Sequence, residues 1–182
     1  MGAGCGLLTA CSLPSTFDPW PAELRAQLGT LGERNWIVVA EASFPAHSRR
    51  GVRQTTSSQE IPATLELVLS ELERTEHVRP RMYMARELRY VENETAPGID
   101  PLREQLKTAL HGHPVTELEN QSMMTLLEDA SQTFQVLVIR TPTALPYSTV
   151  FIELRHGYWD ADAEMQLRDK MGKAADGSST NT

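Results

Sequence analysis

The chain has 182 residues, 40 % hydrophobic and 6 % aromatic, which is the size and composition of one globular domain with a short extension at each end. Its formal charge of −7 argues against a sequence-independent nucleic-acid binder, because such a protein needs a basic face to displace counterions. No hydrophobic run is long enough to span a bilayer as a helix.

The N-terminal segment, residues 1–20, holds both cysteines, Cys5 and Cys11, so the body of the chain offers neither a disulfide framework nor a cysteine metal ligand. Leu8 to Cys11 reads Leu-Thr-Ala-Cys, the form of a bacterial lipobox whose cysteine is lipidated after cleavage. On this interpretation the protein is periplasmic or tethered to a membrane through Cys11. The basic start of such a signal is missing, so a second interpretation stays open, a small-residue N-terminus on a cytoplasmic protein.

The first half of the body alternates helical and extended patterns. Apolar residues recur at helical spacing after Pro21 and again from Ile61 to Leu72, whereas Trp36 to Ala40 is an unbroken apolar run typical of a strand buried on both faces. In chain order the pattern predicts a helix from Pro21 that stops at Gly32, a strand at 36–40, a polar loop at 49–59, a helix at 61–72 and a short strand at 82–85.

The second half continues this alternation after a charged, turn-rich stretch at 86–98. It predicts a helix capped by Asp100 and opened by Pro101, a strand at 115–118, a helix at 120–130, a strand at 134–139, a loop at 141–146, a strand at 150–154 and a helix at 161–171. We therefore expect an α/β fold, a compact single domain over 21–171 with a mostly parallel sheet flanked by helices, and a disordered tail at 172–182.

Polar residues gather directly after the first predicted strand, at Glu41, Ser43 and His47. Ligands of open α/β folds bind beyond the carboxyl ends of strands, so these side chains are candidates for substrate contact. A turn cluster bonded to nearby backbone is the alternative.

Several blocks of the body resemble the D-ribose pyranase and L-fucose mutarotase family of sugar-ring isomerases. They are Leu31-Gly32, Ala42 with Phe44-Pro45-Ala46-His47-Ser48, Met82-Tyr83-Met84-Ala85, Phe134 to Ile139, and Tyr147 followed by Val150-Phe151-Ile152 and Gly157. The resemblance covers about Pro21 to Gly157 and is closest to the fucose mutarotase form. It implies a homo-oligomeric ring, a monosaccharide site closed partly by a neighbouring subunit, and a reaction that uses no cofactor and no metal.

The chain departs from the family at positions that matter for proton transfer. The family's acid–base histidine is Glu33 here, its strand-end aspartate is Glu41, its second histidine is Ser43, and its Tyr-Gly-Asn reads Tyr147-Ser148-Thr149. Two carboxylates in one pocket can still divide into an acid and a base. We therefore expect Glu41 and Glu33 as catalytic residues, with His47, Ser43, Tyr147 and Thr149 binding the substrate.

Two functions follow from this set. The first is a mutarotase or pyranase that interconverts the anomers or ring forms of a monosaccharide. The second is a binding protein that keeps the fold and a pocket for a sugar or another small molecule but has lost catalysis, a hypothesis favoured by the replaced histidine.

Overall fold

The computed structural model describes residues 18–159 and 161–177. Within them the chain forms α1 (Trp20–Leu28), β1 (Trp36–Ala40), β2 (Val52–Thr56), α2 (Ile61–Glu73), β3 (Val78–Ala85), the 3-10 helix η1 (Arg86–Tyr90), α3 (Ile99–Ala109), β4 (Val115–Leu118), α4 (Asn120–Thr133), β5 (Val136–Arg140), β6 (Val150–His156) and α5 (Ala161–Gly177). The expected tether and Cys11 lie before residue 18, outside the described residues.

One six-stranded sheet organises the fold, in the order β2-β5-β1-β6-β3-β4. The pairs β2–β5, β5–β1 and β3–β4 are parallel, whereas β6 runs antiparallel to both of its neighbours, β1 and β3. The mostly parallel α/β sheet expected from the sequence is confirmed. The reversed β6 matters for the site, because its first residues meet the last residues of β1.

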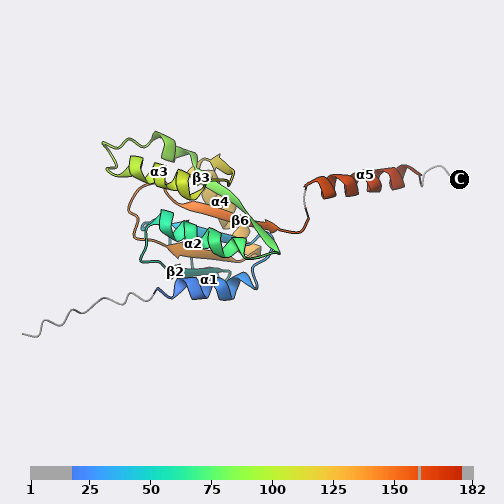
Figure 1. Cartoon of the computed structure of the whole chain (residues 1–182), viewed down its shortest axis with the longest axis horizontal. Coiled ribbons are helices and arrows are strands. Elements are labelled where there is room, and N and C mark those ends of the chain that lie inside the picture. Colours follow the sequence, from blue (N-terminus) through green and yellow to red (C-terminus); the bar gives the residue numbers. More distant parts are fainter. Residues whose placement is uncertain (1–17, 160, 178–182) are drawn as a thin grey trace, which may run out of the picture.

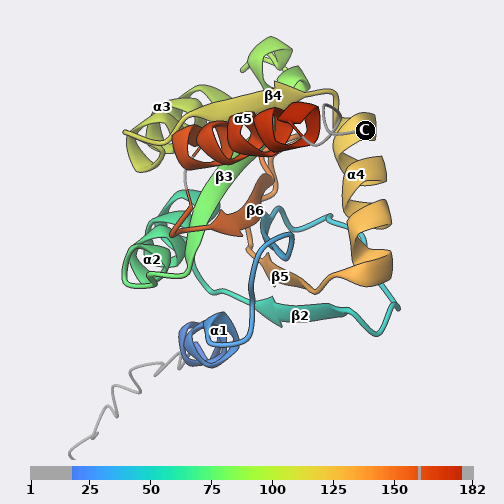
Figure 2. The same ribbon diagram turned by 90° about the vertical axis from the view of Figure 1, so that its right-hand side faces the viewer.

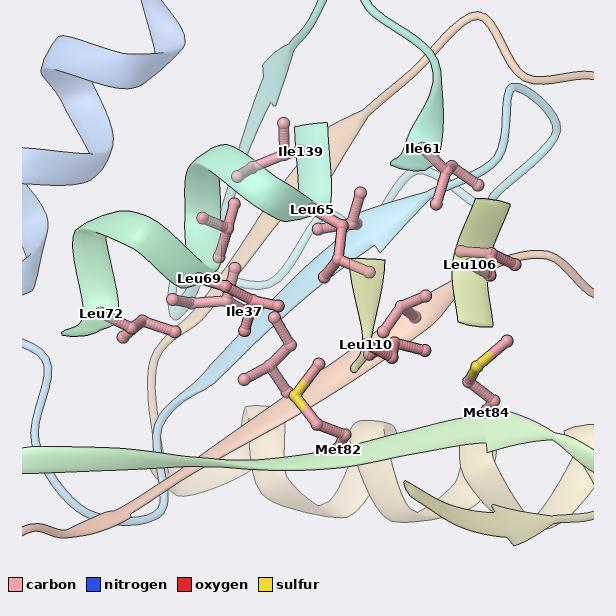
Figure 3. Close-up of a cluster of buried hydrophobic side chains, with 14 of the residues drawn as sticks. Ile37, Ile61, Leu65, Leu69, Leu72, Met82, Met84, Leu106, Leu110 and Ile139 are labelled. Atoms are coloured by element: carbon pink, nitrogen blue, oxygen red, sulfur yellow. The ribbon is translucent and has the colours of Figure 1, made fainter. Parts of the chain in front are cut away.

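Helices cover both faces of this sheet, with α1, α2 and α3 on one side and α4 on the other (Figure 2). The larger core packs α1, α2 and α3 against alternate strand residues, including Ile37, Met82 and Ile139 (Figure 3). The smaller core packs Met123 and Leu127 of α4 against the opposite strand face. At about 1.5–3 kcal/mol for each fully buried aliphatic side chain, these two layers supply the main stabilisation of the domain.

The element boundaries differ from the sequence prediction in several places. The stretch expected as a polar loop, 49–59, contains strand β2, which sits at the edge of the sheet and pairs only with β5. Its side chains are mostly exposed or half-buried, so it lacks the apolar run by which a central strand is recognised. Helix α1 ends at Leu28 rather than at Gly32, and α3 begins at Ile99 after Gly98, whose φ of 99° ends the preceding turn.

Helix α5 projects away from the sheet and its covering helices (Figure 1). It continues to Gly177, so residues 172–177 are helical where a disordered tail is expected from composition. Among the described residues, no helix is both long and apolar enough to cross a membrane.

Candidate functional site

Two segments far apart in the chain meet where β1 ends and β6 begins. Because these strands are antiparallel and Val39 lies opposite Val150, the same register places Ala40 beside Thr149 and Glu41 beside Ser148. The backbone N–H of Glu41 accordingly donates to Thr149 Oγ1 at 3.2 Å. The pairing of the apolar strands β1 and β6 therefore brings Glu41 and Thr149 within hydrogen-bond distance of each other.

The Glu41 carboxylate is held from two sides. Ser43 Oγ donates to Glu41 Oε1 at 3.0 Å, and the backbone N–H of Ser148 donates to Oε2 at 3.1 Å. The Ser148 hydroxyl lies 3.3 Å from the same Oε2 and 2.7 Å from the carbonyl oxygen of Leu145. The half-buried carboxylate is therefore fixed in orientation before any ligand arrives.

Tyr147 adopts a backbone conformation that tyrosine rarely takes, with φ of 59°. It follows Pro146 in the turn that leads into β6, and its side chain is 39 % exposed. Left-handed backbone in a residue with a Cβ costs about 1–2 kcal/mol, so the surrounding turn must hold it there. Strain of this kind gathers at ligand sites, which makes Tyr147 a candidate contact.

A cavity of about 270 Å³ opens beside these groups. One part of its wall is polar and comes from Glu41, Ser43, Asn120, Tyr147 and Thr149, and the other is apolar and comes from Phe44, Pro45, Ala85, Met124 and Pro146. The volume lies below the 300–1,000 Å³ of pockets for drug-sized ligands. A small ligand with hydroxyls on one side and C–H groups on another matches this wall.

The first turns of α4 contribute Asn120 and Met124 to the cavity wall. Neither residue was predicted from the sequence. The Glu87 carboxylate on η1 accepts the backbone N–H of Asn120 at 2.9 and 3.0 Å, and Arg86 pairs with Glu119 at 2.6 Å. These contacts tie η1 to the N-terminus of α4, where a carboxylate also complements the helix dipole. The sequence feature that could have identified Asn120 is its position just after the end of a strand and at the start of a helix.

The structure brings four of the six predicted site residues together: Glu41, Ser43, Tyr147 and Thr149. His47 lies nearby without lining the cavity. Its ring centroid is 5.9 Å from that of Phe44, and its buried Nε2 has no hydrogen-bond partner among the described residues.

Glu33 lies at the other end of β1. Its carboxylate contacts His156 Nδ1 at 3.1 Å and Arg155 Nε at 3.8 Å, and its side chain is 40 % exposed. The five residues of β1 alone separate it from Glu41 by about 16 Å. The expected pairing of the two carboxylates in one pocket is therefore wrong within a single chain, because β1 runs straight between them.

Another hollow, of about 530 Å³, lies between α2 and α3 and is lined by Glu60, Glu66 and Glu104 with neutral neighbours. Its lining comes from α2, α3 and Glu60 before α2, and Glu60 accepts a hydrogen bond from Thr143 Oγ1. Across the described part of the chain, no group of three or more His, Cys, Asp or Glu side chains is placed to hold a metal ion.

Comparison with known proteins gives a consistent result. The model of the RbsD / FucU transport protein family matches residues 21–156. The structure of Bacillus subtilis RbsD complexed with D-ribose has a TM-score of 0.52 and 17 % identity, covering 84 % of this chain and 96 % of that one. The fucose mutarotase from Streptococcus pneumoniae in complex with L-fucose has a TM-score of 0.50 and 17 % identity, covering 76 % and 96 %. No curated protein sequence matches the chain.

Proposed function

Because this chain belongs to the RbsD / FucU transport protein family, we propose that it binds a monosaccharide beside Glu41 and interconverts the anomers or ring forms of that sugar by acid–base catalysis without a cofactor. The observation that carries the proposal is the clamped Glu41 carboxylate in the wall of a small cavity that is part polar and part apolar. Two solved structures of the same fold are described with D-ribose and L-fucose bound, which supports a sugar as the ligand class.

The reaction opens and recloses a cyclic hemiacetal. Glu41 removes the proton of the anomeric hydroxyl as the bond between the anomeric carbon and the ring oxygen breaks, and the ring oxygen gains a proton. The open aldehyde rotates and the ring closes: the attacking hydroxyl returns its proton to the group that protonated the ring oxygen, and Glu41 returns its proton to the carbonyl oxygen, which becomes the anomeric hydroxyl again. Apart from Glu41, the one titratable side chain among the described residues lining the cavity is Tyr147, and in this scheme its hydroxyl would donate the proton to the ring oxygen.

The other polar groups of the wall would orient the sugar hydroxyls. Thr149 Oγ1 accepts the Glu41 N–H, which leaves its own proton for a ligand oxygen. Ser43 lines the same wall, and His47 would act only by steadying Phe44. Phe44 and Met124 offer apolar surface to the C–H face of the ring.

Glu33 takes no part in this scheme within one subunit, since β1 separates it from the cavity. The resemblance to ring-forming isomerases implies that a neighbouring subunit completes the site, and Glu33 could meet the ligand only by that route. We therefore assign proton transfer to Glu41 and treat Glu33 as the residue that tests for a shared site.

A non-catalytic sugar-binding protein is the second candidate. It is favoured by a specific observation: within residues 18–159 and 161–177 of one chain, the cavity wall contains a single carboxylate and no histidine. Such a protein would hold the sugar through the same hydroxyl contacts without accelerating the exchange of its ring forms.

Saturation-transfer NMR on a panel of aldoses that includes ribose and fucose separates the candidates. We expect the wild-type protein to bind one sugar and to accelerate exchange between its anomers or ring forms. Binding without faster exchange would instead establish the non-catalytic candidate. Absence of both across the panel would refute a monosaccharide as the ligand.

A further inference from the structure

The turn before β6 is braced by a side chain. Residues 146 and 147 form a tight turn between Leu145 and Ser148. The Ser148 N–H donates to Glu41 Oε2 at 3.1 Å. The Ser148 hydroxyl donates across the turn to the Leu145 carbonyl oxygen at 2.7 Å.

The two middle residues of this turn explain why the closure is needed. Pro146 has its backbone φ fixed by the ring, which suits the second position, and Tyr147 has φ of 59° in the third position, where a type II turn requires a positive value. Glycine normally occupies that place without strain. Tyr147 stays there at a cost, so the Ser148 hydroxyl bond across the turn helps to hold the Tyr147 backbone in this conformation.

We propose that Ser148 is a positioning residue that couples the Glu41 carboxylate to Tyr147, its backbone N–H fixing Glu41 and its hydroxyl closing the turn that presents Tyr147. This inference rests on the proposed function for its catalytic consequence, but not for the coupling itself. Ser148 is fully buried and does not line the cavity, so it acts through its two neighbours rather than on the ligand.

The Ser148 hydroxyl also faces the Glu41 carboxylate. Its one proton has two acceptors within reach, the Leu145 carbonyl oxygen at 2.7 Å and Glu41 Oε2 at 3.3 Å, and the shorter contact is the bond across the turn. The Ser148 N–H donates to the same Oε2, while Ser43 Oγ donates to Oε1. One residue therefore contacts both the carboxylate and the turn.

The test uses Ser148→Ala, which removes the hydroxyl and keeps the backbone N–H, with Ser43→Ala as the matched control. Both substitutions delete a hydroxyl beside Glu41, but only Ser148→Ala opens the turn. In sugar-free protein labelled with ¹³C on tyrosine rings and glutamate carboxyl carbons, we expect Ser148→Ala to shift both the Tyr147 and Glu41 signals. Ser43→Ala should shift the Glu41 signal alone. Signals are assigned with Tyr147→Phe and Glu41→Gln.

The kinetic arm separates positioning from general damage. Ser148→Ala should lower kcat for ring exchange by about tenfold or more while KM changes by less than about threefold, because misplaced reacting groups slow the chemical step. Unchanged Tyr147 and Glu41 signals with unchanged kcat would overturn the coupling. If Ser148→Ala does not fold, Ser148→Gly gives the same readouts, since it also removes the hydroxyl and keeps the backbone N–H.

The two proposals fail in different ways. If wild-type protein accelerates no exchange, the catalytic function fails while the tyrosine and glutamate signals still decide the coupling. If exchange is accelerated and Ser148→Ala changes neither signal nor kcat, the function stands and the coupling is refuted.

Discussion

Tyr147 offers the sharpest test of the strained turn, through the pair Tyr147→Gly and Tyr147→Ala. Both variants remove the ring, which is 39 % exposed and contributes little burial, so they differ only in backbone preference at φ 59°. Alanine keeps the left-handed cost of about 1–2 kcal/mol, whereas glycine is free of it. Glycine in turn loses about 0.4–1 kcal/mol through the larger entropy of its unfolded chain.

The difference predicts that Tyr147→Gly is more stable than Tyr147→Ala by about 0.5–1 kcal/mol. For a domain of this length that equals a rise in Tm of about 1–4 °C by calorimetry, and urea unfolding measures the free-energy difference directly. The exposed helical residue Gln105 of α3 is the matched control, where glycine should be less stable than alanine by about 1 kcal/mol. Alanine equal to or better than glycine at position 147 would refute the strained turn.

Two further predictions concern the core and its charged rim. Leu65 is fully buried in the larger core, so Leu65→Ala should lower the free energy of unfolding by about 2–5 kcal/mol in urea titrations, whereas Leu126→Ala on the exposed face of α4 should change it by less than about 0.5 kcal/mol; similar losses would contradict the described packing. The hydrogen bond from Arg25, together with Arg74, holds the pKa of the buried Glu71 below its usual value of 4.5. The ionised Glu71 carboxylate therefore stabilises the fold at pH values above its pKa in the unfolded chain. This stabilisation is lost as the pH falls through the lower pKa that Glu71 has in the folded protein. Unfolding of wild type and Glu71→Gln should therefore differ most at neutral pH and converge in acid, and a constant gap would show that the ion pair carries no pH-dependent stability.

The buried helices and strands could be predicted from the sequence because buried elements have a recognisable pattern of apolar residues. Trp36 to Ala40 and Val115 to Leu118 were located to the residue, the first because it is apolar throughout. Strand β2 was not predicted, because an edge strand paired with one neighbour does not need a run of apolar residues. The reversed direction of β6 carries no signal in its own residues, since pairing partners decide it.

The candidate site was predicted in part for a related reason. Glu41 was located because it ends a strand, and Tyr147 with Thr149 through the family resemblance; the reversed β6 then brings both segments together. Glu33 was assigned by its match to a family histidine, but β1 carries it to the opposite end of the sheet from Glu41. Ser148 and Asn120 were missed because their roles depend on a backbone N–H and on a helix start, which residue type alone does not reveal.

The measurement that tests the central claim most directly is the rate of anomer or ring-form exchange of the bound sugar with wild type, Glu41→Gln and Glu33→Gln. Glutamine keeps the shape of the side chain and removes the proton acceptor, and positioned acid–base groups contribute about 10²–10⁴-fold. We predict that Glu41→Gln still binds the sugar but loses nearly all acceleration. Glu33→Gln keeps the acceleration unless a neighbouring subunit brings it to the site. Full acceleration by Glu41→Gln would contradict the account.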